Sequence, residues 1–304
     1  MPINEKIATN VGPAHIDIAY ERLGDPAAPP LLLIQGLGAQ LVGWPDGFCA
    51  ALVERGLHLI RFDNRDVGLS THLANTPPPD LPAVLRGDLS SVSYTLSDMA
   101  ADAVGLLDAL GIESAHLVGA SMGGAIAQTI AIEQPHRARS LTSMMSTTGN
   151  MQVGQPAPET MKALFSGGSP VTRQEVIDRQ VLAVQVVGSP GFPTDPAEAA
   201  ANAARAYDRG GYDLTGLSRQ AIASVAAGDR TELLRQLDVP TLVLHGLDDA
   251  MCDVSGGRAT AAAIPQAKLV LIEGMGHNLP RALWPDIADH IAEIVRAGEG
   301  RIHN

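Results

Sequence analysis

Gly119-Ala120-Ser121-Met122-Gly123 follows directly on the apolar run Ala115-His116-Leu117-Val118. The pattern Gly-x-Ser-x-Gly is typical of a serine held on a sharp turn between a strand and a helix, with its hydroxyl turned out of the core. Glycines are expected there because the strand and the helix approach too closely for side chains. Since chance also produces this pattern, the flanking sequence must support the interpretation.

The sequence on both sides of the pentapeptide predicts a strand before it and a helix after it. Ser114–Val118 is an apolar stretch of strand length. Ala125–Glu133 has the composition of a buried helix, which Pro135 then stops. Strand, glycine-framed serine and helix in this order favour a reactive Ser121 over a serine in an ordinary surface loop.

The rest of the chain alternates strand and helix patterns around this unit. Strands are expected at His15–Leu23, Leu31–Ile34, His58–Phe62, Leu141–Met145, Thr241–His245 and Lys268–Ile272. Helices are expected at Trp44–Arg55, Leu96–Leu110, Gly256–Ile264 and Leu283–Ala297, before a loose tail at Gly298–Asn304. The alternation predicts an α/β fold, a mostly parallel sheet with helices on both faces. The alternating strand His15–Leu23 is expected half-exposed near the sheet edge.

From about Ser146 to Arg230 the strand patterns vanish. Helices are expected there at Glu159–Phe165, Arg173–Val187, Pro196–Tyr207 and Ser218–Ala226. We therefore expect a core domain of residues 1–145 and 231–304, and a helical cap of residues 146–230 inserted after the sixth strand. Such an insertion would lie over the carboxyl ends of the strands, where open α/β sheets bind their ligands.

A serine hydroxyl is a poor nucleophile at neutral pH and needs an adjacent base, usually a histidine. Four of the nine histidines fall in predicted strands, where a packed, hydrogen-bonded imidazole is the expected role: His15, His58, His116 and His245. His277 instead follows the strand Leu269–Ile272 on a glycine-rich loop. That position, at the carboxyl end of a strand, favours His277 as the base.

The acid that orients the base is expected between the serine and the histidine in sequence, also at a strand end. Asp248 and Asp249 both follow the strand that ends at His245-Gly246, and spacing alone does not separate them. Backbone donors for an oxyanion complete the set. The N–H of Met122 comes with the turn, and the loop Gln35-Gly36-Leu37-Gly38 offers the N–H of Leu37 as the second.

These motifs together resemble the α/β-hydrolase superfamily from end to end, in its esterase and lipase branch. Within it, the chain is particularly similar to the aclacinomycin methylesterases and the mycobacterial LipG-type carboxylesterases. The resemblance rests on Leu33–Gly38, Asp63–Ser70, the Ser121 turn, His245–Asp249 and Gly274–His277.

The resemblance implies roles for individual residues. The acid of the family occupies the last position of a Gly-x-x-Asp pattern, which selects Asp249, and its oxyanion donors correspond to Leu37 and Met122. Many relatives have histidine where this chain has Gln35, a position that braces the loop. Arg65 could be read as an anion-binding residue, but the resemblance favours a bracing role for its segment.

Composition excludes several partners. A formal net charge of -12 argues against nucleic acid and anionic membrane surfaces. Two cysteines, Cys49 and Cys252, imply no disulfide framework and favour a reducing, cytoplasmic location; Cys252 is expected to be an apolar filler. Neither a signal peptide nor a transmembrane run is visible. Metal-ligand spacing and phosphate loops are also missing, so neither metal nor cofactor is expected.

The expected function is therefore a serine carboxylesterase acting on a small-molecule ester. Ser121 would be the nucleophile, His277 the base and Asp249 the orienting acid, while Leu37 and Met122 hold the oxyanion. Flexible apolar side chains suit an acyl chain or a bulky alicyclic group, although packing within the cap's own core is the better explanation for most of them: Met144, Met145, Met151, Met161, Leu164, Val181, Leu182, Val186 and Val187. Three alternatives stay open: a C–C bond hydrolase, a cofactor-free perhydrolase and a non-catalytic ligand receptor. The oligomeric state is not indicated.

Overall fold

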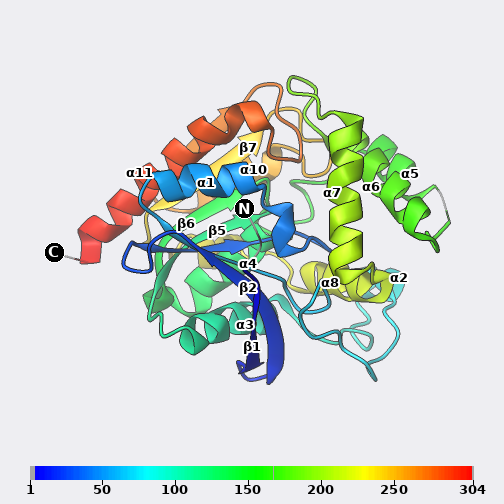
Figure 1. The fold of residues 1–304 in the computed structure, drawn as a ribbon, viewed down its shortest axis with the longest axis horizontal. Coiled ribbons are helices and arrows are strands. Elements are labelled where there is room, and N and C mark those ends of the chain that lie inside the picture. Colours follow the sequence, from blue (N-terminus) through cyan, green and yellow to red (C-terminus); the bar gives the residue numbers. More distant parts are fainter. Residues whose placement is uncertain (1–3, 167, 303–304) are drawn as a thin grey trace.

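The computed structural model describes residues 4–166 and 168–302. In this part of the chain, eight strands form one sheet in the order β1-β2-β4-β3-β5-β6-β7-β8 (Figure 1). The strands are β1 (Lys6–Val11), β2 (Ile16–Leu23), β3 (Pro30–Ile34), β4 (His58–Phe62), β5 (Ala115–Ala120), β6 (Ala138–Met144), β7 (Thr241–Gly246) and β8 (Lys268–Ile272). β2 runs antiparallel to both β1 and β4, and all other neighbours are parallel. The predicted α/β fold is confirmed.

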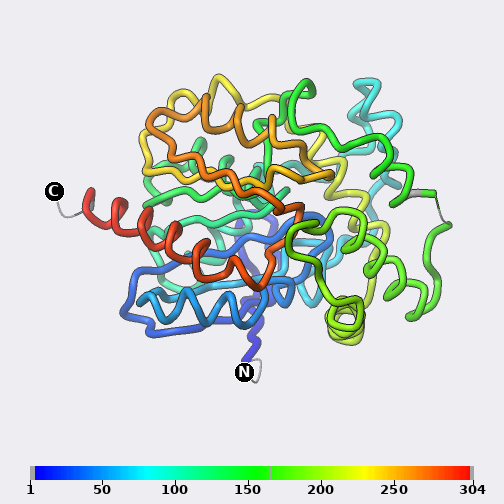
Figure 2. The backbone as a smooth tube through the Cα atoms, turned by 90° about the horizontal axis from the view of Figure 1, so that it is seen from above, coloured from blue at the N-terminus to red at the C-terminus, as the bar shows by residue number. Residues whose placement is uncertain are grey.

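Helices cover both faces of the sheet. They are α1 (Asp46–Glu54), α2 (Leu81–Leu85), α3 (Leu96–Ala109), α4 (Met122–Glu133), α5 (Pro158–Phe165), α6 (Arg173–Val187), α7 (Pro196–Gly210), α8 (Leu214–Ala226), α9 (Thr231–Leu234), α10 (Ser255–Ala263) and α11 (Trp284–Ile302). α1 and α11 pack on one face, and α3, α4 and α10 pack on the other (Figures 1 and 2). None of the described helices combines the length and hydropathy needed to cross a membrane.

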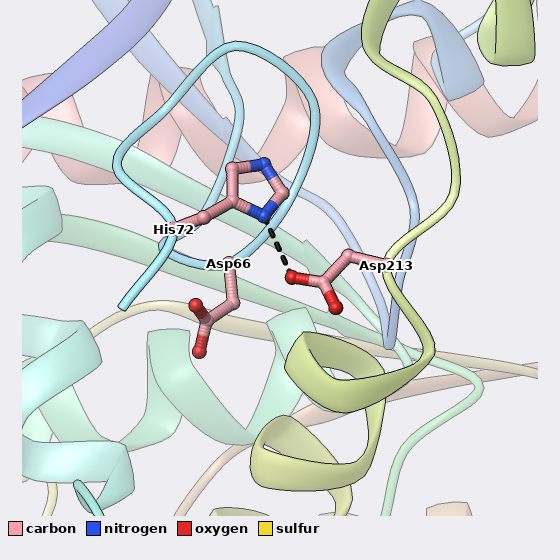
Figure 3. A group of neighbouring side chains, drawn as sticks. All are labelled: Asp66, His72 and Asp213. Carbon is pink, nitrogen blue, oxygen red and sulfur yellow. Dashed lines mark hydrogen bonds and ion pairs between the residues drawn. The ribbon is translucent and has the colours of Figure 1, made fainter. Parts of the chain in front are cut away.

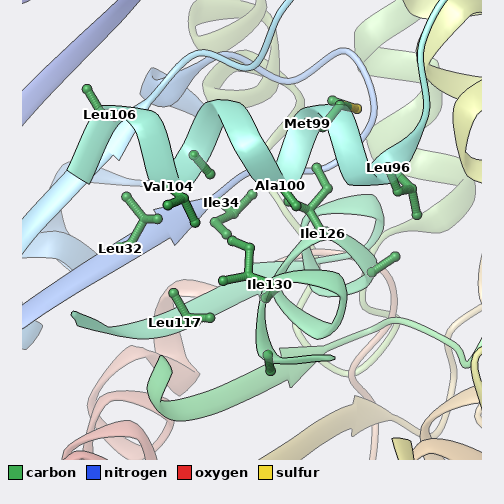
Figure 4. Packing of buried hydrophobic residues seen from close by; sticks show 14 of the residues in the cluster. Leu32, Ile34, Leu96, Met99, Ala100, Val104, Leu106, Leu117, Ile126 and Ile130 are labelled. Carbon is green, nitrogen blue, oxygen red and sulfur yellow. The ribbon is translucent and has the colours of Figure 1, made fainter. Parts of the chain in front are cut away.

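The strand β3 shows why two separate apolar layers form. Its side chains alternate between the faces, so Leu32 and Ile34 pack toward α3 and α4 with Ile126 (Figure 4). Leu31 and Leu33 belong to the cluster on the opposite face. A central strand covered on both faces must be apolar throughout. Each of these fully buried side chains contributes about 1.5–3 kcal/mol relative to an exposed one.

The chain between β6 and β7 holds α5, α6, α7 and α8, and the described residues there contain no strand. We call residues 146–230 the insertion. Its helices lie together beyond one end of the sheet (Figures 1 and 2). Local sequence explains two of the helix starts: Thr172 and Glu175 form a capping box, and the Asp213 carboxylate accepts from the N–H of Gly216. The helical insertion after the sixth strand is thus confirmed, whereas its separation as a cap domain stays a prediction.

The expectation of a half-exposed strand near the edge was wrong in part. β1, which the sequence analysis missed, takes the edge position, and β2 lies inside it. The polar residue Glu21 of β2 is buried because its carboxylate pairs with the guanidinium of Arg61, with an N–O distance of 2.6 Å. His15, expected in a strand, lies in the turn before β2.

The predicted loose tail at Gly298–Asn304 was also wrong, because α11 continues to Ile302. Glu299 lies in this last part of the helix. Its carboxylate accepts from Arg139 and approaches the ring of His116, both at 3.0 Å. These contacts to the sheet hold the end of the helix in place. Residues 303–304 lie outside the described residues.

Candidate active site

Ser121 lies on a tight turn between β5 and α4. Its backbone has φ 55° and ψ −122°, a conformation that costs a non-glycine residue about 1–3 kcal/mol. A Cβ on Gly119 would lie 2.0 Å from the carbonyl oxygen of Gly123, and one on Gly123 would lie 2.1 Å from that of Ile34. The two glycines are therefore required by close backbone approach, as predicted.

The structure brings Ser121, His277 and Asp249 together. The hydroxyl of Ser121 lies 3.0 Å from Nε2 of His277, and Nδ1 of His277 lies 2.7 Å from Oδ2 of Asp249. Their positions follow β5, β8 and β7, which are parallel strands and so end at the same edge of the sheet. A carboxylate, an imidazole and a hydroxyl linked in this order by hydrogen bonds can transfer the serine proton to the imidazole.

The surroundings of Asp249 keep its carboxylate ionised. Oδ1 accepts from the N–H groups of Met251 and Cys252, at 2.9 and 2.8 Å. Burial raises the pKa of Asp249, but the hydrogen bonds of His245 and His277, the charge of His277 and the N–H of Cys252 outweigh this effect and hold the pKa well below its ordinary value. With an ionised partner at Nδ1, the free Nε2 of His277 can accept the serine proton.

The neighbouring Asp248 has a different role. Its Oδ2 accepts from the N–H of Gly274 at 2.8 Å and does not contact the imidazole. Asp248 therefore ties the loop after β7 to the loop that carries His277. Of the two carboxylates that spacing left open, only Asp249 reaches the ring.

A second imidazole contacts Asp249 from inside the core. Nε2 of His245 lies 2.7 Å from the carbonyl oxygen of Cys252 and 3.4 Å from Oδ2 of Asp249. Both neighbours are acceptors, so Nε2 carries the proton. His245 is fully buried, and its packed role agrees with the expectation for a histidine within a strand.

The two predicted oxyanion donors flank Ser121. Met122 is the first residue of α4, directly after the serine. The loop of Leu37 lies against the serine as well, because a Cβ on Gly36 would lie 3.1 Å from the Cβ of Ser121. Among the described residues, the N–H groups of Leu37 and Met122 have no hydrogen-bond partner. Both are therefore available to a ligand at this serine.

The segment Asp63–Ser70 braces the site, as the resemblance implied. The Asp63 carboxylate accepts from the N–H groups of Leu41 and Leu69, at 2.7 and 2.9 Å. Arg65 forms a two-armed pair with the buried carboxylate of Asp102, at 2.6 and 2.7 Å. Nε and Nη2 of the guanidinium are thus engaged by a buried carboxylate, and an anion-binding role for Arg65 has no support.

Gln35 replaces the histidine of many relatives and still serves the loop. Its Oε1 accepts from the N–H of Gly36 at 3.1 Å, and its carbonyl accepts from the amide of Asn64 at 3.1 Å. The side chain is buried. A bracing role is therefore retained without an imidazole.

The two cysteines are buried and free. Burial raises the pKa of the Cys49 thiol to about 11 and that of Cys252 further still. Neither thiol is a nucleophile at neutral pH, and Cys252 is the filler that the sequence predicted. Met144 and Met145 likewise pack in the core cluster, so these two do not provide the flexible apolar surface considered for a substrate.

Three possible metal ligands lie close together at the border between the core and the insertion, namely Asp66, His72 and Asp213 (Figure 3). The Asp66 carboxylate already accepts from the hydroxyl of Tyr94 at 2.9 Å and lies 3.2 Å from the guanidinium of Arg219. Nδ1 of His72 lies 2.8 Å from Asp213. An arginine cation beside the carboxylates does not fit a metal site, and the cluster links α8 to the core instead.

The insertion contributes polar side chains to the loops of the site, among them Gln220 and Ser189, which were not predicted from the sequence. Gln220 of α8 accepts from the N–H of Gly38, next to Leu37. Ser189, in the loop after α6, accepts from the N–H of Gly276 at 2.9 Å, next to His277. No local pattern marks either residue, since each lies more than 80 positions from its partner, at separations of 182 and 87 residues.

The model of the α/β hydrolase fold family matches residues 29–280. The chain belongs to this family. It is 30% identical over 295 residues to rhodomycin D methylesterase DnrP of Streptomyces peucetius, with 91% of this chain and 94% of the relative covered. It is also 30% identical over 258 residues to a poly(3-hydroxyalkanoate) depolymerase of Ectopseudomonas oleovorans, covering 84% and 80% of the two chains. The methylesterase relative confirms the resemblance expected from the motifs.

Solved structures share this architecture. The meta-cleavage product hydrolase CumD of Pseudomonas fluorescens IP01 superimposes with a TM-score of 0.74 at 20% identity, covering 97% of this chain and 98% of that chain. The esterase RhEst1 of Rhodococcus sp. ECU1013 gives a TM-score of 0.68 at 23% identity, covering 98% and 99%. Because the identities are low, these matches establish the fold alone.

Proposed function

We propose that this protein is a serine carboxylesterase that hydrolyses small-molecule esters through an acyl-enzyme intermediate. The observation that carries the proposal is the continuous hydrogen-bonded chain from Ser121 through His277 to Asp249, with distances of 3.0 and 2.7 Å. The relationship to a methylesterase over 91% of the chain supports ester chemistry.

In the proposed acylation step, the Ser121 hydroxyl attacks the ester carbonyl while Nε2 of His277 takes its proton. Asp249, ionised and held by two backbone N–H groups, keeps the Nδ1 proton of His277 in place and stabilises the imidazolium. The N–H groups of Leu37 and Met122 stabilise the negative oxygen of the tetrahedral intermediate. His277 then returns the proton to the departing alcohol as the C–O bond breaks.

In the proposed deacylation step, the free Nε2 of His277 accepts a proton from water, which attacks the acyl-serine. The second tetrahedral intermediate uses the same two backbone donors. Its collapse releases the carboxylic acid and returns the proton to the Ser121 oxygen. The cycle uses groups of this chain and water, and it needs neither cofactor nor metal.

The substrate proposed is an ester with an apolar acyl or alicyclic group, and residues 146–230 are proposed to form a cap over it. The name of the methylesterase relative makes methyl esters, with methanol as the leaving group, the first substrates to test. The C–C bond hydrolase and the perhydrolase use the same three side chains and are distinguished by substrate. A cytoplasmic location stays a prediction from the two cysteines.

The test is turnover of p-nitrophenyl esters of increasing acyl length, followed by methyl esters of bulky acids. We expect Ser121→Ala to lower kcat by about 10³-fold or more, because the nucleophile is lost. Ser90→Ala is the matched control, since Ser90 is an exposed loop serine.

An active-site-directed organophosphate should lose its leaving group and add its phosphoryl mass to Ser121 in the native protein and in Ser90→Ala, and not in Ser121→Ala. Full ester turnover by Ser121→Ala would contradict the proposal. Activity on a vinylogous 1,5-diketone with none on any ester would instead favour the C–C bond hydrolase.

A further inference from the structure

Gln220 connects the insertion to the loop that carries Leu37. The residue lies on α8 and is fully buried. Its side-chain Oε1 accepts from the backbone N–H of Gly38 at 2.8 Å, and its Nε2 donates to the carbonyl oxygen of Arg65 at 2.7 Å. Both ends of one amide are therefore used, each on a different loop of the core.

The Gly38 end of this contact fixes the shape of the loop. Gly38 has φ +67°, which glycine adopts readily, and a Cβ there would lie 2.6 Å from Cδ1 of Leu217 on α8. The N–H of Ala39 closes the turn onto the carbonyl of Gly36, at 3.2 Å. Leu37 lies between two held residues. The carbonyl of Gly36, before it, is held by Ala39 within the loop, and the N–H of Gly38, after it, is held by Gln220.

The Arg65 end of the contact is a rigid point of the core. Arg65 is held through two short hydrogen bonds to Asp102, and its guanidinium lies 4.9 Å from the ring centre of Tyr94. An amide side chain offers an acceptor and a donor at its two ends, which a carboxylate or a hydrocarbon does not. The Gln220 side chain can thus hold Gly38 at a fixed distance from Arg65 through its two hydrogen bonds.

We propose that Gln220 is a positioning residue for the ester hydrolysis proposed above, on which this inference rests. By holding Gly38, it keeps the N–H of the adjacent Leu37 aimed at the oxygen that becomes negative next to Ser121. The donor remains in the chain when Gln220 is replaced, but it is no longer held. Since small misplacements of reacting groups cost up to about 10²-fold, we expect a loss in kcat of about 10- to 100-fold.

The test variant is Gln220→Met, which has a similar length and neither polar atom. Its matched control is Ser224→Ala on the same helix, because the Ser224 hydroxyl donates only to the backbone carbonyl of Gln220. We expect Gln220→Met to lower kcat for p-nitrophenyl butyrate by about 10- to 100-fold with KM within about threefold. Ser224→Ala should keep the native kinetic constants.

A pair of inhibitors separates loop positioning from general loosening of the fold. A trifluoromethyl ketone forms a hemiketal oxyanion on the serine, whereas the matching methyl ketone serves as the ground-state ligand. Gln220→Met should weaken the trifluoromethyl ketone by the same factor as kcat and leave the methyl ketone unchanged. Equal weakening of both ketones, or native kcat in Gln220→Met, would overturn the inference.

Two outcomes keep this inference distinct from the proposed function. Ester turnover that survives Ser121→Ala contradicts the proposed function, whereas turnover that depends on Ser121 but not on Gln220 contradicts only the positioning role. Should Gln220→Met not fold, Gln220→Asn replaces it, because an amide one methylene shorter cannot reach both Gly38 and the Arg65 carbonyl. We expect Gln220→Asn to lower kcat and trifluoromethyl ketone affinity in parallel by about threefold to tenfold, and native values for both would overturn the inference.

Discussion

The carboxyl edge of the sheet and the insertion contribute to the candidate site in different ways. The sheet edge carries all five predicted site residues, namely Leu37, Ser121, Met122, Asp249 and His277, each just after a strand. The insertion carries none of them. It instead supplies polar contacts to the two loops on which Leu37 and His277 lie. The proposed chemistry thus lies at strand ends, and the positioning role proposed for Gln220 makes its precision depend on packing from a distant segment.

The insertion contacts the two loops through different groups. At the loop of Leu37, the hydrogen bond comes from one buried side chain, Gln220, and Leu217 packs against Gly38 beside it. At the loop of His277, the backbone takes part as well, since the N–H of His277 donates to the carbonyl of Val187 at 2.7 Å. Ser189 adds its hydroxyl, which accepts from Gly276. A backbone carbonyl such as that of Val187 is kept by every residue type, so the histidine loop should resist mutation of the insertion better.

The largest effect is expected from the core, at Asp249. Asp249→Asn removes the charge that fixes the tautomer of His277 and stabilises its imidazolium, and we expect kcat to fall by about 10³- to 10⁴-fold. The measurement is steady-state hydrolysis of p-nitrophenyl butyrate. Asp248→Asn is the matched control, since its Oδ atom can still accept from Gly274, and it should stay within a few-fold of the native rate. Equal losses in both variants would disprove the assignment of the acid.

The next effect concerns the stability of the core loop that supports Gln220. Arg65→Met leaves the carboxylate of Asp102 buried without its partner, which costs about 3–5 kcal/mol in the free energy of unfolding. Urea denaturation measures this loss. The double variant Arg65→Met/Asp102→Leu should be more stable than Arg65→Met, because no uncompensated charge remains. A double variant less stable than the single one would show that the pair is not the source of the effect.

At the histidine loop, a smaller effect is expected from the insertion. Ser189→Ala removes the hydroxyl that accepts from Gly276 and lies 2.5 Å from Oδ1 of Asn278. An unsatisfied buried N–H costs about 1–3 kcal/mol, but the backbone bond to Val187 still holds the loop, so we expect kcat to fall by only about tenfold. Ser166→Ala, at an exposed serine of the same insertion, should keep the native rate. Identical rates in the two variants would remove Ser189 from the site.

The sequence predicted the parts of the fold that depend on local patterns. β4, β8 and α6 have the predicted bounds, because apolar runs and caps determine them. Strand ends then predicted Ser121 as the nucleophile and His277 as the base, while Asp249 was predicted over Asp248 only through the family pattern. The remaining parts depend on long-range partners.

Three residues illustrate what local sequence could not predict. Glu21 is polar and still buried, because Arg61 comes from another strand. Gln220 and Ser189 are ordinary polar residues of helical segments, and only the folded chain brings them to Gly38 and Gly276. Side chains that satisfy a distant backbone group leave no local periodicity or motif.

The smallest effect is expected at the ion pair between His72 and Asp213, which ties α8 to the core (Figure 3). Burial lowers the pKa of His72, but the hydrogen bonds of Asp213 and the Gly68 carbonyl, with the charges of Asp213 and Asp66, outweigh it, and the net pKa is raised. A raised folded-state pKa stabilises the fold fully below the unfolded value of about 6.5, and this stabilisation is lost as the pH rises through the folded value.

His72→Gln should therefore lower Tm most at about pH 5.5, and the difference from the native protein should shrink toward about pH 8.5, where the imidazole loses its charge in both states. Asp213 stays ionised across this window because the N–H of Gly216 and His72 offset burial and lower its pKa. His136→Gln, at an exposed histidine, should show no such trend. A Tm difference that is constant or grows with pH would mean that the pair is screened by solvent, and that α8 is held on the core by its buried contacts alone.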